Sequence, residues 1–271
     1  MEVRASDGVR LHAEAHGEGV PLLLSCAYCT TSENFRPQVD PLVRAGVRVV
    51  LWDYRGHGRS EAPADPAAYS MDQVVDDLGR VLDRASPNEP AVLGGLSFGG
   101  LASLHLSLRR PERLRGLVLV ASGPGFKNAD AQARWESMVE RTASFVEKHG
   151  CAAFVASKAS ATLVGRDPEL PAAKAAGRAI AAQDPRGLAN FGRRVSGPAA
   201  SVIDDLARIE VPTLVLVGEL DEGYHRAAEV MAARIPKARR VVIPGAGHIV
   251  NIEAEEAFNR ALVGFLEGLR G

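Results

Sequence analysis

The chain has 271 residues, of which 46% are hydrophobic and 24% are charged, and its formal net charge is -1. That length allows one large α/β domain with an insertion, or two small domains. The balanced charge excludes the basic footprint of a nucleic-acid-binding protein, and no apolar run reaches the roughly 18 residues of a membrane span. The charged start Met1-Glu2-Val3-Arg4 is unlike a secretory signal, so we expect a soluble, cytoplasmic protein.

Alternating apolar and polar residues around Asp7-Gly8 predict two antiparallel strand segments at the start of the chain. Short apolar runs that alternate with helical patterns then predict a mostly parallel sheet covered on both faces, an α/β fold. The strands predicted in this way are Leu22–Leu24, Val47–Trp52, Ala91–Leu93, Leu117–Ala121, Val211–Val217 and Arg240–Ile243. The helices predicted between and after them are Gln38–Ala45, Met71–Arg84, Leu101–Leu108, Tyr224–Arg234 and Glu253–Leu269.

The alternation of strands and helices stops between residues 123 and 197. This stretch is rich in Ala, Arg and Glu, has no convincing strand pattern, and predicts several short helices. Breaks between these helices are expected near Gly150, Gly165 and Asp184. Because strands resume after the stretch, we predict one α/β core, residues 1–122 and 198–271, with residues 123–197 inserted as a helical cap.

The pentapeptide Gly95-Leu96-Ser97-Phe98-Gly99 lies between a predicted buried strand and a predicted helix. In that context G-x-S-x-G is typical of a nucleophile elbow, a tight turn that exposes the serine hydroxyl. Gly95 and Gly99 lack a Cβ atom, which lets strand and helix approach closely enough to hold Ser97 in a strained backbone conformation. A glycine-rich turn with an incidental serine is the alternative, so an acid and a histidine must follow downstream.

Both groups are present after later strands. Glu219, Asp221 and Glu222 follow one predicted strand, and His248 follows the last one, in Gly245-Ala246-Gly247-His248. The carboxyl ends of parallel strands share one rim of a sheet, so these side chains and Ser97 should converge there. A serine hydroxyl becomes nucleophilic when an imidazole accepts its proton, and a carboxylate must orient that imidazole and stabilise its cation.

These motifs, together with Trp52–Ser60 and Val211-Pro212-Thr213-Leu214, resemble the α/β-hydrolase fold family over nearly the whole chain. The resemblance implies an α/β-hydrolase fold and a catalytic triad in the chain order Ser97, Asp221, His248. It favours Asp221 over its acidic neighbours, because the family's acid matches the fourth residue of Gly-x-x-Asp. It also gives the loop after the second buried strand a structural role, which we expect for Asp53, Arg55 and His57.

The resemblance implies an oxyanion hole made by two backbone N–H groups, those of Phe98 and Tyr28. Many relatives carry His-Gly before the second donor, whereas this chain has Cys26-Ala27. Leu24–Thr31 and Phe35-Arg36-Pro37-Gln38 are instead similar to the 3-oxoadipate enol-lactonase branch, where a Ser-rich loop and Thr-Thr replace His-Gly. The C-x-x-C spacing of Cys26 and Cys29 lacks the second pair that a zinc site needs, so we expect no metal there.

The substrate pocket should lie between the sheet rim and the cap, lined by apolar side chains. The substrate-binding residues predicted for it are Tyr28, Phe126, Trp135, Met138 and Phe191, with Phe98, Phe145 and Phe154 as further candidates. A substrate carboxylate could be held by a basic side chain of the cap, although a solvated surface position is the expectation for each one. These basic candidates are Arg141, Lys158, Arg193 and Arg194.

The leading hypothesis is a cofactor-free, metal-free serine hydrolase that cleaves a small carboxylic ester or lactone through an acyl-enzyme. The alternatives with the same triad are carbon–carbon bond hydrolysis, thioester hydrolysis and perhydrolysis. A hydrolase-fold binding protein without turnover is a different class, against which the complete triad argues. The expected partner is a small-molecule substrate, with neither nucleic acid nor membrane, and the protein should be a monomer or a homodimer.

Overall fold

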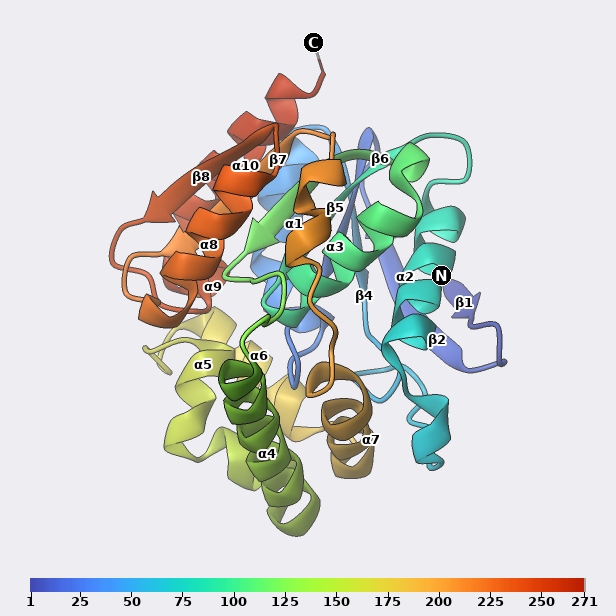
Figure 1. The fold of residues 1–271 in the computed structure, drawn as a ribbon, viewed down its shortest axis with the longest axis vertical. Helices are drawn as coiled ribbons and strands as arrows, with labels where there is room; N and C mark the ends of the chain where they lie inside the picture. The colour runs from blue at the N-terminus through green and yellow to red at the C-terminus, as the bar shows by residue number, and fades with distance from the viewer. Residues whose placement is uncertain (271) are drawn as a thin grey trace.

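The computed structural model describes residues 1–270 and is organised around one eight-stranded sheet (Figure 1). Its strand order is β1-β2-β4-β3-β5-β6-β7-β8. The strands span Glu2–Arg4 (β1), Arg10–His16 (β2), Val20–Ser25 (β3), Val47–Trp52 (β4), Ala91–Leu96 (β5), Leu114–Val120 (β6), Thr213–Gly218 (β7) and Ala238–Ile243 (β8). β1 and β2 are antiparallel to their neighbours, and β3 to β8 run parallel, as the sequence predicts.

β3 to β7 are buried on both faces, which explains their nearly continuous apolar sequences, whereas β8 at the edge of the sheet is largely exposed and contains two arginines. In β3, Leu22 and Leu24 point into the hydrophobic cluster on one face, whereas Leu23 belongs to the cluster on the other. The register of β3 sets Leu24 opposite Gly94 of β5 and Ser25 opposite Gly95. The strand end that leads to Ser97 therefore lies directly beside the strand end that leads to Tyr28.

Helices cover both faces of this sheet. Side chains of α2, α3 and α8 pack on one face, and those of α1 and α10 pack on the other. The helices span Arg36–Arg44 (α1), Met71–Ala85 (α2), Phe98–Arg109 (α3), Ala129–Val155 (α4), Ala161–Val164 (α5), Pro171–Ala181 (α6), Pro185–Phe191 (α7), Glu222–Arg234 (α8), Val250–Glu253 (α9) and Glu255–Gly268 (α10). The predicted final helix is divided in the structure, because Ala254 adopts φ -139° and ψ 55° between α9 and α10.

Between β6 and β7 the described chain forms α4 to α7 and no strand. These helices gather beyond one end of the sheet, at the bottom of Figure 1. Their boundaries follow the expected breaks: Gly150 has a non-helical φ of 81° and kinks α4, Gly165 ends α5, and the Asp184 carboxylate accepts hydrogen bonds from the first amides of α7. The helices follow the strand that ends beside Ser97, so they lie next to the elbow.

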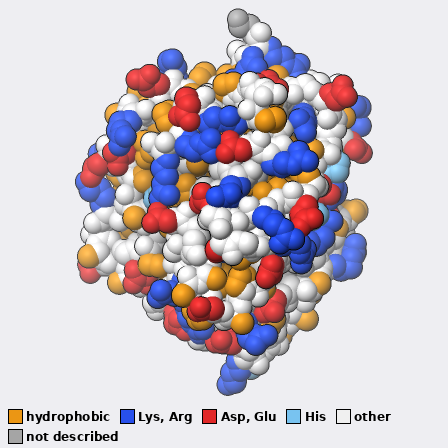
Figure 2. Space-filling view, turned by 90° about the vertical axis from the view of Figure 1, so that its right-hand side faces the viewer, with side chains coloured by type: hydrophobic (Ala, Val, Ile, Leu, Met, Phe, Trp, Pro, Cys, Tyr) orange, Lys and Arg blue, Asp and Glu red, His pale blue; other side chains and the backbone are white. Residues whose placement is uncertain are grey.

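Charged side chains of both signs lie intermixed over the face shown in Figure 2, with hydrophobic side chains scattered between them. This mixture matches the net charge of -1. None of the helices in residues 1–270 is long and apolar enough to cross a membrane.

Candidate active site

Ser97 occupies the turn between β5 and α3 with φ 53° and ψ -114°, a conformation that a non-glycine residue adopts only under strain. The surrounding glycines allow it. A Cβ atom on Gly95 would lie 2.1 Å from the Gly99 carbonyl carbon, and one on Gly99 would lie 2.2 Å from the Ser25 carbonyl oxygen. The Ser97 N–H donates to Val120 O at 2.8 Å, so the strained turn is anchored to the neighbouring strand.

Asp221 and His248 form a hydrogen-bonded pair at the ends of β7 and β8. The distance from His248 Nδ1 to Asp221 Oδ2 is 2.9 Å, and both side chains are about nine-tenths buried. The loop that carries His248 is held by Glu253, which accepts from Gly247 N at 3.0 Å and pairs with Arg166 from the loop between α5 and α6. Glu219, the neighbouring acid, instead accepts from Gly245 N.

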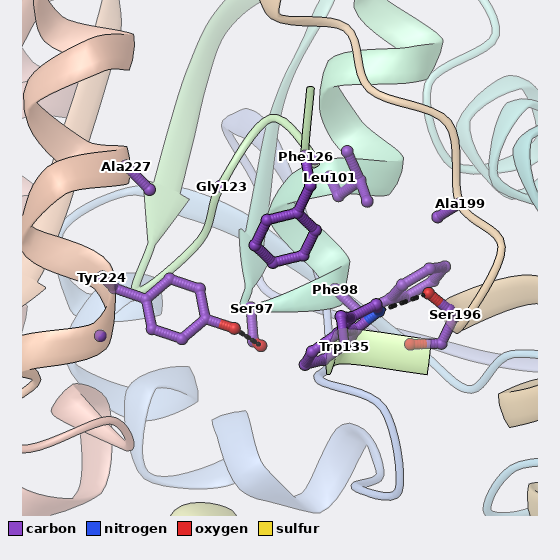
Figure 3. A pocket seen from close by; sticks show the side chains of 12 residues that line it. Ser97, Phe98, Leu101, Gly123, Phe126, Trp135, Ser196, Ala199, Tyr224 and Ala227 are labelled. Carbon is purple, nitrogen blue, oxygen red and sulfur yellow. Dashed lines mark hydrogen bonds between the residues drawn. The ribbon is translucent and has the colours of Figure 1, made fainter. Parts of the chain in front are cut away.

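Tyr224, in the first turn of α8, lies beside both Ser97 and His248. Its phenol oxygen is 3.4 Å from Ser97 Oγ, as the dashed line in Figure 3 marks, and its ring centroid is 4.7 Å from that of His248. Burial raises the pKa of the phenol, which therefore stays protonated at neutral pH. No hydrogen bond joins Ser97 to His248 within residues 1–270; catalytic hydrogen bonds are often long in enzymes without bound substrate.

Tyr28 lies in a tight turn after β3. Thr30 N donates to Ala27 O at 3.1 Å, and Cys29 has a φ of 67°, as the third residue of a type II turn requires. Neither Tyr28 N–H nor Phe98 N–H has a hydrogen-bond acceptor within residues 1–270, and Phe98 is the first residue of α3, where an amide has no intrahelical partner. Both amides therefore have no acceptor in the part of the chain that the structure describes.

The loop after β4 supports that turn. His57 Nε2 accepts from Cys29 N at 3.3 Å, while its Nδ1 contacts the Arg55 carbonyl at 3.3 Å, so the neutral ring donates on one side and accepts on the other. Asp53 accepts from Ser32 N at 2.7 Å and Arg59 N at 3.0 Å. The structural role expected for this loop is therefore observed.

Two cavities meet at Ser97. The smaller, about 230 Å³, is lined by Ser97, Phe98, Leu101, Gly123, Gly125, Phe126, Trp135, Ser196, Ala199, Gly223, Tyr224 and Ala227. The larger, about 430 Å³, is lined by Ala27, Tyr28, Cys29, Ser97, Trp135, Met138, Val139, Thr142, Phe154, Ala159, Thr162, Leu163, Asp221, Tyr224 and His248. Ser97, Trp135 and Tyr224 line both cavities and so form the boundary between them.

The predicted pocket residues divide into two groups. Tyr28, Trp135, Met138 and Phe126 line one or both cavities. Phe191 does not: it is fully buried and packs against Tyr28 and other rings of the core, which hold it away from both cavities. Among the further candidates Phe98 and Phe154 reach a cavity, whereas Phe145 packs against His149.

The four basic side chains considered for a substrate carboxylate line neither cavity. Arg193 is paired with Glu140 at 2.9 Å and Glu147 at 3.0 Å, and the other three are exposed. Tyr224 is the residue that reading the sequence missed. Its position three residues after Asp221, at the start of a predicted helix, is the signal that could have placed it at the same rim.

Cys26 and Cys29 are buried, and burial raises the pKa of both thiols, which keeps them protonated and unreactive. All three cysteines are free. No cluster of three metal-ligating side chains occurs within residues 1–270. The C-x-x-C spacing reflects the turn after β3, with the Cys26 thiol directed at the Thr30 carbonyl.

The family model of the alpha/beta hydrolase fold matches residues 20–255, which include the elbow, Asp221 and His248. The chain belongs to this family. A Bacillus subtilis (strain 168) protein provisionally named 2-succinyl-6-hydroxy-2,4-cyclohexadiene-1-carboxylate synthase is 26% identical to this alpha/beta hydrolase, and the similarity covers 99% of each chain.

Solved structures of hydrolases resemble the chain over nearly its full length. A thermophilic esterase from Thermogutta terrifontis has a TM-score of 0.85 and 25% identity, covering 100% of this chain and 99% of its own. The enol-lactonase from Burkholderia xenovorans LB400 has a TM-score of 0.83 and 26% identity, covering 98% of this chain and 100% of its own. The similarity to an enol-lactonase is thus present, alongside equal similarity to an esterase.

Proposed function

We propose that this alpha/beta hydrolase is a serine hydrolase that cleaves a small carboxylic ester or lactone through an acyl-enzyme intermediate. The observation that carries the proposal is the pairing of His248 with Asp221 at 2.9 Å in the cavity that Ser97 also lines, with Ser97 held in a strained elbow. The esterase and the enol-lactonase among the similar structures support the same reaction class.

In the proposed mechanism Ser97 Oγ attacks the substrate carbonyl and His248 accepts the serine proton. Asp221 accepts from the His248 Nδ1–H, which sets the imidazole tautomer and stabilises its cation. The amides of Tyr28 and Phe98 bind the oxygen of the tetrahedral intermediate. His248 then gives the proton to the leaving oxygen, and water attacks the acyl-enzyme by the same route in reverse. No step needs a metal or cofactor.

We also propose that residues 123–197 act as the cap of this site, since α4 and its neighbours supply Trp135 and much of the lining of the larger cavity. The three free cysteines favour a reducing, cytoplasmic location. A small-molecule substrate is the only partner the proposal requires, and the triad needs no second chain, so a monomer or a homodimer would serve.

The first prediction tests the nucleophile. Ser97→Ala should lower kcat for p-nitrophenyl acetate by about four to six orders of magnitude while leaving the thermal unfolding temperature nearly unchanged. A fluorophosphonate probe should label the wild type at Ser97 and leave the variant unlabelled. Near-wild-type turnover by Ser97→Ala would contradict the assignment, and an unlabelled, inactive wild type would favour a binding protein. Thioesters and carbon–carbon substrates in the same assay separate the alternative reactions.

A further inference from the structure

The two cavities at Ser97 differ in which catalytic groups they contain. The larger one is lined by His248 and Asp221, and the smaller one by neither. In Figure 3 the Tyr224 phenol reaches Ser97 from α8, opposite Phe98 and Trp135, so that the nucleophile stands at the junction. Trp135 is held there by a hydrogen bond from its Nε1 to Ser196 O at 2.8 Å. There is thus space on both sides of Ser97 for a substrate attacked at this point.

Neither cavity is lined by a lysine or an arginine of residues 1–270. Among residues 1–270 no Asp, Glu, Lys, Arg or His lines the smaller cavity, and the larger one is lined by Asp221 and His248, which the reaction uses. Arg193, a basic residue of the cap, is neutralised by Glu140 and Glu147. A substrate carboxylate would therefore lose its hydration without gaining an ionic partner, which is strongly unfavourable.

We propose that the substrate is an uncharged open-chain ester with an apolar arm on each side of its carbonyl, the acyl arm in the smaller cavity and the alcohol arm in the larger. The inference rests on the proposed serine-hydrolase function. The assignment of the alcohol arm to the larger cavity follows from proton delivery. His248 must reach the leaving alcohol oxygen, and His248 lines the larger cavity but not the smaller one. Tyr224 and Trp135 separate the arms, and the size of the smaller cavity limits the acyl chain.

The test uses p-nitrophenyl esters of increasing acyl length and measures kcat/KM. For the wild type kcat/KM should rise about three- to fourfold per methylene until the smaller cavity is full. The hemisuccinate ester, whose chain ends in a carboxylate, should be at least about 100-fold poorer than the valerate ester. Equal or better turnover of the hemisuccinate would overturn the uncharged substrate class.

Two variants of the smaller cavity should act in opposite directions. Ala227→Leu narrows it and should shift the preferred acyl chain to shorter lengths, whereas Phe126→Ala widens it and should shift the preference to longer ones. Ala233→Leu places the same side chain on the exposed side of α8 and should keep the wild-type profile. The preference among alkyl butyrates of increasing alcohol length should not change in Ala227→Leu. If Ala227→Leu changes the preference for alcohol length and not the preference for acyl length, the smaller cavity holds the alcohol arm and the assignment is wrong.

Labelling by a fluorophosphonate separates this inference from the proposed function. A labelled, active enzyme whose acyl profile ignores both Ala227→Leu and Phe126→Ala would overturn the two-cavity assignment and leave the serine hydrolase standing. An enzyme that is not labelled at Ser97 would overturn the proposed function and this inference together.

Discussion

At the scale of single residues, Tyr224 has a ring that separates the two cavities and a hydroxyl that contacts Ser97. Its ring forms part of the boundary between the cavities, and its hydroxyl is the hydrogen-bonding partner of Ser97 Oγ at 3.4 Å. Such a long hydrogen bond between neutral groups stabilises the site by little, on the order of 1 kcal/mol or less. The ring, by contrast, excludes volume whether or not the hydroxyl is present. The two properties can therefore be separated by substitution.

Tyr224→Phe keeps the ring and should change kcat/KM for the preferred ester by less than about tenfold, with the acyl-length profile of the wild type. Tyr224→Ala removes the boundary and should flatten that profile, because methylene selectivity needs a close-fitting surface. Both profiles are measured with the p-nitrophenyl series. Identical profiles for the two variants would contradict the boundary role, and a loss of activity in Tyr224→Phe comparable to Ser97→Ala would make the hydroxyl catalytic.

The sequence predicted that Ser97, Asp221 and His248 would converge, because each follows a strand of a parallel sheet and such strand ends meet at one rim. In the structure all three line the larger cavity. The sequence could not rank aromatic side chains in the same way. Phe191 is buried against Tyr54 and His57, while Trp135 reaches both cavities, yet both are aromatic residues of one helical stretch. Which of them faces a cavity depends on how the helices pack, and helical spacing alone does not record that packing.

At the scale of elements, the loop between β4 and α2 is held by a buried ion pair. The Arg55 side chain is 0% exposed and donates to Asp77 through Nε and Nη2 at 2.7 Å and 2.8 Å, while its Nη1 donates to Asp7 at 2.7 Å. This links the loop to α2 and to the turn between β1 and β2. Removal of one partner would leave a buried charge without compensation.

Arg55→Ala should therefore lower the free energy of unfolding by about 3–5 kcal/mol, measured by urea denaturation. The matched control is Arg80→Ala, which breaks the exposed pair between Arg80 and Asp76 of α2 and should cost less than about 1 kcal/mol. Asp77→Asn should also be more damaging than the control, because the Asp77 side chain is 1% exposed. Equal losses for Arg55→Ala and Arg80→Ala would contradict the importance of the buried pair.

Element positions were predictable where apolar periodicity was strong. The strands lie within a few residues of their expected bounds, and the breaks at Gly150 and Gly165 coincide with positive φ angles that favour glycine. The break at Ala254 was missed, because alanine favours a helix and nothing in the local sequence marks the change of direction between α9 and α10. Local sequence preference is overruled there by tertiary structure.

At the scale of the whole molecule, His57 lies where three separate parts meet. It belongs to the loop after β4, its Nε2 accepts from Cys29 of the turn that carries Tyr28, and its ring lies 4.4 Å from that of Phe191 at the end of α7. Its side chain is almost fully buried, and burial lowers the pKa of His57 to about 4 from an ordinary value near 6.5. The loop after β4, the turn that carries Tyr28 and the end of α7 all contact this ring.

The last prediction concerns stability against pH. Between pH 6.5 and about 4 the unfolded chain binds a proton at His57 that the folded protein does not. The contribution of the neutral His57 ring to the free energy of unfolding is therefore complete above pH 6.5 and is lost as the pH falls toward 4. A pKa shift of this size corresponds to about 3 kcal/mol in the free energy of unfolding, which urea denaturation at a series of pH values measures.

The variant His57→Gln should be less stable than the wild type at pH 7.5, but its free energy of unfolding should decline less steeply between pH 6.5 and about 4. His149→Gln, which changes an exposed histidine, should follow the wild-type curve. If His57→Gln declines as steeply as the wild type, the acid sensitivity arises from other groups and the junction at His57 does not control it.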